Sequence, residues 1–237
     1  MATPALEIKD LHAWYGESHI LHGINLNVQP GQVVTLLGRN GAGRTTTLRA
    51  IMGLTGARKG SIKIHGEEAI GLSTHRVAQL GLGYCPEERG IFASLTTEEN
   101  LRLPPPLKVK RGKLMSEQEI YAMFPNLAER RHSPGTRLSG GEQQMLAVAR
   151  ILRTGADILL LDEISEGLAP VIVQALARMI RELKKQGFTI VMVEQNFRFA
   201  APLADHFIVI EHGEVVLSFP AAELPAHQDK LDELLSV

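Results

Sequence analysis

The residues with the clearest chemical potential lie in one glycine-rich stretch, LLGRNGAGRTTTL, at positions 36–48. Its glycines fit the phosphate-loop pattern G-x-x-x-x-G-K-[ST], although arginine stands where the pattern has lysine. Backbone N–H groups and a helix start favour an anion there, and the Thr45 hydroxyl would face a Mg²⁺ ion. A glycine turn without a ligand is the alternative. As a nucleotide site, the loop would contribute Gly38, Arg39, Asn40, Gly41, Ala42, Gly43, Arg44, Thr45 and Thr46.

A second candidate lies at the end of an apolar run, ILLLDE, at positions 158–163. The run places two carboxylates at the C-terminal tip of a buried strand. Asp162 would hold Mg²⁺ through water, and Glu163 would polarise an attacking water molecule. On its own, the pair is also compatible with the acidic start of a loop. Together with the glycine loop, it predicts a nucleotide triphosphatase with Thr45 and Asp162 as metal ligands and Glu163 as a catalytic residue.

A third motif, LSGGEQQ at positions 138–144, stands directly before the helical run MLAVARILR. Ser139 can cap that helix, and the two glycines after it let backbone N–H groups approach an anion closely. A helix cap without a ligand is the alternative. The motif resembles the signature sequence of the ABC ATPases. This resemblance implies that four residues face the γ-phosphate of an ATP held by a second subunit: Ser139, Gly140, Gly141 and Glu142.

The resemblance to ABC ATPases covers essentially the whole chain and implies further roles. WYG at 14–16 matches the adenine-stacking position, so Tyr15 is the expected platform, with an ordinary core aromatic as the alternative. GYCPEERGIFASLTTEENL resembles the segment that couples the nucleotide site to a membrane subunit, and SEGLAP resembles the loop that crosses between two cassettes. Closer still, GRNGAG, IFASLTTEENL, DEISEGLAP and VEQN are similar to the smaller ATPase subunit of branched-chain amino acid importers. A related amide or urea importer is the alternative.

Three residues depart from the broad ABC pattern. Arg44 replaces the loop lysine, Glu87 stands where a metal-contacting glutamine is usual, and Gln195 stands where a switch histidine is usual. The resemblance still implies a metal ligand at Glu87 and a catalytic residue at Gln195. Arginine forks its donors and is larger, so it is not equivalent to lysine beside phosphate. Because Asp162 and Glu163 are present, we expect ATP binding and hydrolysis, with a weakly hydrolysing regulatory cassette as the alternative.

Composition and the lack of targeting patterns bear on which partners the protein binds and where in the cell it lies. The 237 residues have a formal net charge of -1, which offers no broad basic face, so no nucleic acid partner is expected. Cys85 is the one cysteine and cannot form an intrachain disulfide, which suits a reducing compartment. The start, MATPALEIKD, lacks the pattern of a secretion signal, and no apolar run approaches the roughly 20 residues that span a bilayer. We expect a peripheral location at the cytoplasmic face of the cell membrane, held there by a permease.

The sequence patterns around these residues predict strands and helices that together form an α/β fold. Continuous apolar runs, typical of buried parallel strands, are QVVTLL (32–37), DILLLDE (157–163) and FTIVMVE (188–194). Alternating patterns predict an antiparallel layer from LEIKDLHAWYG and INLNVQPGQ, and HFIVIEHGEVVLSF predicts a hairpin that turns at His212 and Gly213. VIVQALARMIRELKKQG predicts an amphipathic helix. We therefore predict a single ABC nucleotide-binding domain over 1–237: a P-loop NTPase core with a parallel sheet, an antiparallel β layer and an inserted α-helical subdomain at about 88–153.

The resemblance also implies partners, because one chain carries one phosphate loop and one signature motif. It implies a second ABC cassette (a copy or a paralogue), transmembrane permease subunits, and a periplasmic or extracellular substrate-binding protein. The predicted function is ATP hydrolysis that drives uptake of branched-chain or other hydrophobic amino acids. A non-transport ABC ATPase would normally carry coiled-coil arms or two cassettes. The segment at 103–113 is predicted to be a solvated loop, and His19 and His22 lack the further ligands of a metal site.

Overall fold

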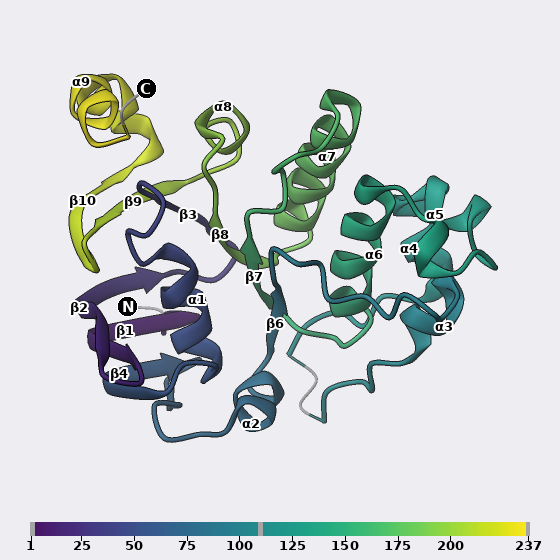
Figure 1. The fold of residues 1–237 in the computed structure, drawn as a ribbon, viewed down its shortest axis with the longest axis horizontal. Helices are drawn as coiled ribbons and strands as arrows, with labels where there is room; N and C mark the ends of the chain where they lie inside the picture. Colours follow the sequence, from purple (N-terminus) through teal and green to yellow (C-terminus); the bar gives the residue numbers. More distant parts are fainter. Residues whose placement is uncertain (1–2, 109–110, 236–237) are drawn as a thin grey trace.

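A computed structural model describes residues 3–108 and 111–235 of the chain (Figure 1). The first two residues of the predicted start and two residues of the predicted loop at 103–113 lie outside this description. Figure 1 shows a small sheet near the N-terminus on one side, a larger sheet in the middle, and a group of helices on the opposite side.

The small sheet is antiparallel, as its alternating sequence predicts. Its strands lie in the order β2-β1-β4-β5. Along β1, the side chains of Leu6 and Ile8 are buried while the residues between and after them are more exposed, so one face packs on the core. The strands are β1 (Leu6–Tyr15), β2 (Ser18–Val28), β4 (Ala57–Ile64) and β5 (Glu67–Glu68).

The large sheet has the order β10-β9-β3-β8-β7-β6. All pairs from β9 to β6 are parallel, and β10 runs antiparallel to β9 at the edge. Every residue of β3, β7 and β8 is buried, which is why these strands are continuous apolar runs. The strands are β3 (Val33–Leu37), β6 (Leu82–Cys85), β7 (Ile158–Asp162), β8 (Thr189–Val193), β9 (His206–Glu211) and β10 (Glu214–Pro220).

Helices cover both faces of the large sheet. On one face, the core joins residues of α1 and of the antiparallel sheet to alternate residues of β7 such as Leu160. On the other face, Leu159 and Leu161 pack with residues of α6 and α7. The helices outside the inserted region are α1 (Arg44–Met52), α2 (Thr74–Gln79), α7 (Pro170–Lys185), α8 (Phe197–Ala200) and α9 (Leu224–Leu235).

The helices grouped on the right of Figure 1 all lie inside the range proposed for the helical subdomain. They are α3 (Thr97–Arg102), α4 (Glu117–Met123), α5 (Pro125–Glu129) and α6 (Gly140–Leu152). Short 3₁₀ turns precede α6 at Gly135–Arg137 and α9 at Ala221–Glu223. The exact limits of the subdomain stay a prediction.

The hairpin predicted near residue 212 is confirmed. His212 and Gly213 have φ of 49° and 78° between β9 and β10, the left-handed conformations of a tight hairpin turn. The strand β6 was not predicted, because its four residues contain a glycine and carry no alternating pattern. In the structure it pairs with β7 and completes the edge of the sheet.

Candidate nucleotide site

The phosphate loop follows β3 and leads directly into α1. A Cβ added at Gly38 would lie 2.2 Å from the carbonyl oxygen of Ile210, and one added at Gly43 would lie 2.9 Å from a methyl group of Leu21. Close packing against the backbone of β9 therefore requires glycine at position 38, whatever the loop binds, whereas at Gly43 the neighbouring atom is the movable end of a side chain. Gly43 also has φ of 107° at the start of α1, which turns the loop into the helix.

Most of the predicted loop residues line one cavity of about 490 Å³. Tyr15 borders this cavity and is 38% exposed, which argues against its being a core aromatic. Gly38, Arg39 and Asp162 do not line the cavity, and neither does any residue of the predicted signature motif. The lining residues are Tyr15, Ile20, Asn40, Gly41, Ala42, Gly43, Arg44, Thr45, Thr46, Glu87, Glu163, Glu166 and Gln195.

Asp162 and Thr45 meet although they are far apart in the sequence. The Thr45 hydroxyl donates to Oδ1 of Asp162 at 2.9 Å, and the Tyr84 hydroxyl donates to Oδ2 at 3.0 Å. Burial raises the pKa of Asp162, and these two hydrogen bonds oppose the rise. Their hydroxyl and carboxylate oxygens are the hard ligands that Mg²⁺ prefers. The predicted metal ligands Thr45 and Asp162 thus form a set that fits Mg²⁺.

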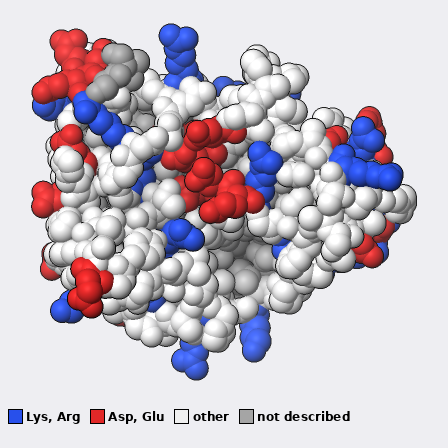
Figure 2. Space-filling view, viewed as in Figure 1, with Lys and Arg blue, Asp and Glu red and all other residues white. Residues whose placement is uncertain are grey.

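Acidic side chains gather near the middle of the face drawn in Figure 2. Glu87, Glu163 and Glu166 each place a carboxylate oxygen within 4.8 Å of the others. Glu87, the third predicted metal ligand, therefore lies beside the predicted catalytic residue, on the border of the same cavity. The guanidinium of Arg44, which lies 3.0 Å from Oε1 of Glu163, partly offsets this concentration of negative charge.

Arg44 is buried, with 4% of its surface exposed, and its guanidinium faces the acidic residues. Nη1 donates to the backbone oxygen of Glu194 at 3.0 Å, and Nη2 donates to Oε1 of Glu163 at 3.0 Å. Nη2 also lies 3.2 Å from Oδ1 of Asn40. The forked guanidinium can span these three acceptors at once, which a single ammonium group cannot do in the same geometry. In this structure Arg44 therefore restrains Glu163.

Glu163 lies at the end of β7 in the left-handed conformation, with φ of 48°. Burial raises its pKa to about 7, and its hydrogen bond with Glu166 acts in the same direction, while the positive charge of Arg44 opposes the rise. Gln195 donates from Nε2 to Oε2 of Glu163 at 3.1 Å and to Oδ1 of Asn40 at 2.8 Å. The structure thus brings both predicted catalytic residues into contact.

No site role was predicted from the sequence for Tyr84, Ser165, Glu166 or Glu194. Glu194 follows β8 and is 1% exposed, and its carboxylate accepts hydrogen bonds from Ser165, at 2.7 Å from the hydroxyl and 3.3 Å from the backbone N–H. Burial raises the pKa of Glu194 to about 7, although the bonds from Ser165 lower it. The sequence contained a pattern that could have identified Glu194 as a site residue, because Glu194 follows an apolar run just as Asp162 and Glu163 do.

The signature motif begins α6 with a capping box. The Ser139 side chain accepts from the Glu142 N–H at 3.3 Å, and the Glu142 carboxylate accepts from the Ser139 N–H at 2.7 Å. A Cβ on Gly141 would lie 2.7 Å from a side-chain carbon of Ile172 on α7. The predicted cap is confirmed, whereas contact with nucleotide stays a prediction for Ser139, Gly140, Gly141 and Glu142.

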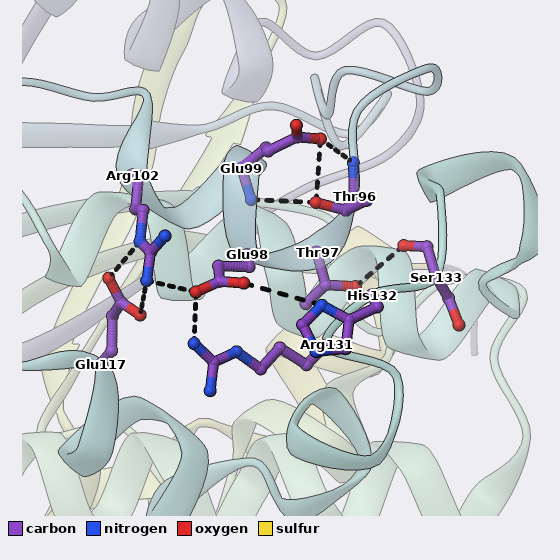
Figure 3. A network of polar contacts seen from close by, with 9 residues as sticks. All are labelled: Thr96, Thr97, Glu98, Glu99, Arg102, Glu117, Arg131, His132 and Ser133. Atoms are coloured by element: carbon purple, nitrogen blue, oxygen red, sulfur yellow. Dashed lines mark hydrogen bonds and ion pairs between the residues drawn. The ribbon is translucent and has the colours of Figure 1, made fainter.

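A polar network holds the chain just before the signature motif (Figure 3). The carboxylate of Glu98, on α3, forms ion pairs with Arg102 and Arg131 and lies 3.7 Å from Nδ1 of His132. The backbone of α3 is tied to the same segment, because the Thr97 N–H donates to the Ser133 oxygen at 3.0 Å. The predicted coupling segment, which ends in α3, is therefore fastened to the residues that lead into the signature motif.

Arg39 points away from the cavity toward α9. Its Nε donates to the backbone oxygen of Leu234 and its Nη2 to that of Glu233, both at 3.0 Å. These carbonyls belong to the last turn of α9, where a helix has free acceptors and partial negative charge. Arg39 therefore fastens the phosphate loop to α9, a contact that its place in the loop did not indicate.

The histidines of β1 and β2 form an aromatic cluster with Trp14. The rings of His19 and His22 have centroids 4.0 Å apart, and Trp14 stacks on His19 at 4.3 Å. Nδ1 of His12 lies 3.1 Å from Nε2 of His19. Among residues 3–108 and 111–235, only the three glutamates named above bring three metal-ligating atoms together. The expectation that His19 and His22 pack rather than bind a metal stays a prediction.

The match to a known family agrees with this arrangement. The model of the ABC transporter family matches residues 21–166, which is more than half of the chain and includes the phosphate loop, the signature motif and the acidic strand end. The protein therefore belongs to the ABC transporter family.

Two relatives and one solved structure are similar to this chain over most of its length. The high-affinity branched-chain amino acid transport ATP-binding protein BraG of Pseudomonas aeruginosa is 38% identical over 92% of this chain and 94% of its own. The probable branched-chain amino acid transport ATP-binding protein LivF of Archaeoglobus fulgidus is 34% identical over 92% and 93%. A solved ATP-binding cassette of an ABC transporter, in its ADP conformation, has a TM-score of 0.81 and 20% identity over 98% and 97% of the two chains, a likeness in fold alone.

In the described part of the chain, no helix has both the length and the apolar character that are needed to cross a membrane.

Proposed function

We propose that this protein is the ATP-hydrolysing subunit of an importer of branched-chain or other hydrophobic amino acids. The observation that carries the proposal is the contact between Thr45 and Asp162, which joins the phosphate loop to the acidic strand end at 2.9 Å. Glu163 lies next to them on the border of the cavity, where it can accept a proton from a water molecule. The substrate class is supported by the names of BraG and LivF.

The roles of the site residues follow from their positions. The loop N–H groups and the start of α1 would bind the phosphates, and Tyr15 would stack on the base. Thr45, Asp162 and Glu87 would hold Mg²⁺, which, when bound, neutralises charge between the β- and γ-phosphates. Before Glu163 can act on water, it has to leave the guanidinium of Arg44. An arriving phosphate, which competes for the same guanidinium, provides a reason for that release.

The signature motif supports a second cassette as partner. No residue from Ser139 to Glu142 lines the cavity of the same chain, so this helix start is free to face a nucleotide held by another cassette. The groove of about 880 Å³ beside the site includes Ser165, Glu166 and Gln195, and belongs to the loop predicted to cross between cassettes. Each complete site would then combine two chains, either identical or paralogous.

A permease would dock on a second groove, of about 370 Å³ and mostly apolar, between α1, β6 and α6. It is lined by Leu54, Arg89, Pro104 and Ile151, and also by Tyr84, whose hydroxyl binds Asp162. Tyr84 therefore gives a direct route from a docked permease to the metal-binding carboxylate. Such docking would hold the protein at the cytoplasmic face of the membrane, and a substrate-binding protein would complete the importer.

The test is phosphate release from Mg²⁺-ATP by the purified protein, alone and with its permease in vesicles, together with uptake of labelled leucine, isoleucine and valine. We expect ATP hydrolysis that rises with permease and uptake that needs ATP. Uptake of urea or short amides instead would refute the substrate class and leave the ATPase intact.

A weakly hydrolysing regulatory cassette is favoured by one observation, the buried ion pair of Arg44 with Glu163. If that pair persists with nucleotide bound, Glu163 is unavailable as a base. ATP binding without measurable phosphate release, in the presence of the permease and a second cassette, would support this alternative.

A further inference from the structure

Glu194 has a buried carboxylate that takes no part in the proposed reaction as described above. It stands at the C-terminal end of β8, next to β7, where Val193 is the register partner of Asp162. Both oxygens of its carboxylate accept from one residue, Ser165, through the hydroxyl and the backbone N–H. Ser165 is itself 4% exposed, so the contact is shielded from water.

Ser165 belongs to the turn at 163–169 that joins β7 to α7 and begins with Glu163. The first residue of the turn is fixed by its N–H, which donates to the Val193 oxygen at 2.9 Å. The carboxylate of Glu194 fixes the turn two residues later. The turn is therefore bonded to the end of β8 at Glu163 itself and again two residues later.

A second route connects the same two glutamates. The backbone oxygen of Glu194 accepts from Nη1 of Arg44, and Nη2 of Arg44 donates to the carboxylate of Glu163. The carboxylate of Glu194 therefore acts on the backbone of Glu163 through Ser165, and the main-chain oxygen of residue 194, which any residue would supply, reaches the side chain of Glu163 through Arg44. The side chains of Glu163 and Arg44 are the charged groups that face Glu194 from the neighbouring elements.

We propose that Glu194 is a positioning residue for ATP hydrolysis, which holds the turn at 163–169 so that the carboxylate of Glu163 stays at the phosphate loop. This inference rests on the proposed ATPase function. The turn also borders the groove beside the site, so the contact between Glu194 and Ser165 lies where a second cassette would press on the turn. Glu194 would thereby keep Glu163 in position at the phosphate loop while a second cassette contacts the turn.

The test is a double-mutant cycle of Glu194→Gln and Ser165→Ala, assayed by phosphate release with saturating and limiting Mg²⁺-ATP. Each single variant should lower kcat about tenfold, because small displacements of an oriented group are costly, while KM for ATP changes less than about twofold. The double variant should lose much less than the product of the two single losses, since both substitutions weaken the same contact. Losses that multiply, or a kcat of Glu194→Gln within about twofold of wild type, would overturn the proposal.

Thr35→Val is the matched control. Thr35 is buried in the neighbouring strand β3, and its hydroxyl has no hydrogen-bond partner among the described residues. Removing this hydroxyl should leave kcat and KM unchanged, which shows that loss of a buried polar atom in this sheet does not by itself slow the reaction.

Amide hydrogen exchange separates this inference from the proposed function. In nucleotide-free protein, Glu194→Gln and Ser165→Ala should each speed exchange in the turn at 163–169 and leave α1 unchanged. If wild type releases no phosphate but the turn still loosens, the ATPase proposal fails and the restraint is real. If wild type is active and exchange in the turn is unaltered in both variants, the positioning role fails alone.

Discussion

Substitution of Glu194 by glutamine should make the protein more stable at alkaline pH. Burial raises the pKa of this carboxyl from its ordinary value of 4.5 to about 7. Between these values the folded chain keeps a proton that the unfolded chain has lost, so the free energy of unfolding falls as the pH rises. Above pH 7 the folded protein carries the full cost of a buried charge. Glutamine is neutral at every pH and removes this dependence.

The raised pKa of Glu194 sets the size of the expected gain in the free energy of unfolding. At 1.36 kcal/mol per pH unit, a pKa of about 7 instead of 4.5 corresponds to about 3 kcal/mol at pH 8. Glutamine keeps only part of the contact with Ser165, which costs about 1 kcal/mol at all pH values. The net gain at pH 8 is therefore about 2 kcal/mol, with a loss of about 1 kcal/mol near pH 4.5.

Urea unfolding at pH 5, 6, 7 and 8 measures this difference for wild type, Glu194→Gln and the control Thr35→Val. The difference between Glu194→Gln and wild type should rise steadily to about pH 7 and then level off, whereas the difference for Thr35→Val should not vary with pH. Parallel curves for Glu194→Gln and wild type would show that Glu194 is charged throughout this range and that burial does not raise its pKa.

Three further predictions concern the nucleotide itself. Arg44→Ala should lower ATP affinity by about one to two orders of magnitude, because hydrogen bonds to charged groups are worth roughly 1.5–3 kcal/mol, whereas Arg44→Lys should retain the affinity. Equal affinities of all three proteins in titration calorimetry would show that Arg44 does not contribute to ATP binding. Glu163→Gln should bind ATP almost as wild type does but release phosphate at least about a hundredfold more slowly, and should accumulate as a dimer in size-exclusion chromatography with ATP; unchanged turnover would remove Glu163 from the reaction. Ser139→Arg should impair hydrolysis while the isolated chain still binds ATP, and loss of binding in that chain would contradict contact across two cassettes.

The sequence was informative wherever a local pattern carries the chemistry. Apolar runs located β3, β7 and β8, because strands buried on both faces need apolar residues at every position. The ends of those runs then identified Asp162 and Glu163, and the parallel order of the strands brought Asp162 to Thr45. The capping box at Ser139 is equally local, since its partners are three residues apart.

The remaining contacts depend on which distant segments become neighbours. Arg44 was expected to face phosphate, but its guanidinium reaches Glu163 and the end of β8 in this structure, a choice that packing decides. Arg39 lies among loop residues in the sequence and yet binds the end of α9. Glu194 was overlooked because its partner Ser165 is on another loop, and one carboxylate after an apolar run is a weaker signal than two.

The strand order has a consequence for how the chain is made. The strand that carries the phosphate loop, β3, lies between β8 and β9, so residues 33–37 find their sheet partners only in residues 189–193 and 206–211. The backbone oxygens that bind Arg39 of the loop are synthesised later still, because they belong to Glu233 and Leu234. A chain emerging from the ribosome therefore exposes an apolar strand and an unformed loop for most of its synthesis, and such distant pairings form slowly. Nucleotide binding should therefore arrive as one of the last events of biosynthesis.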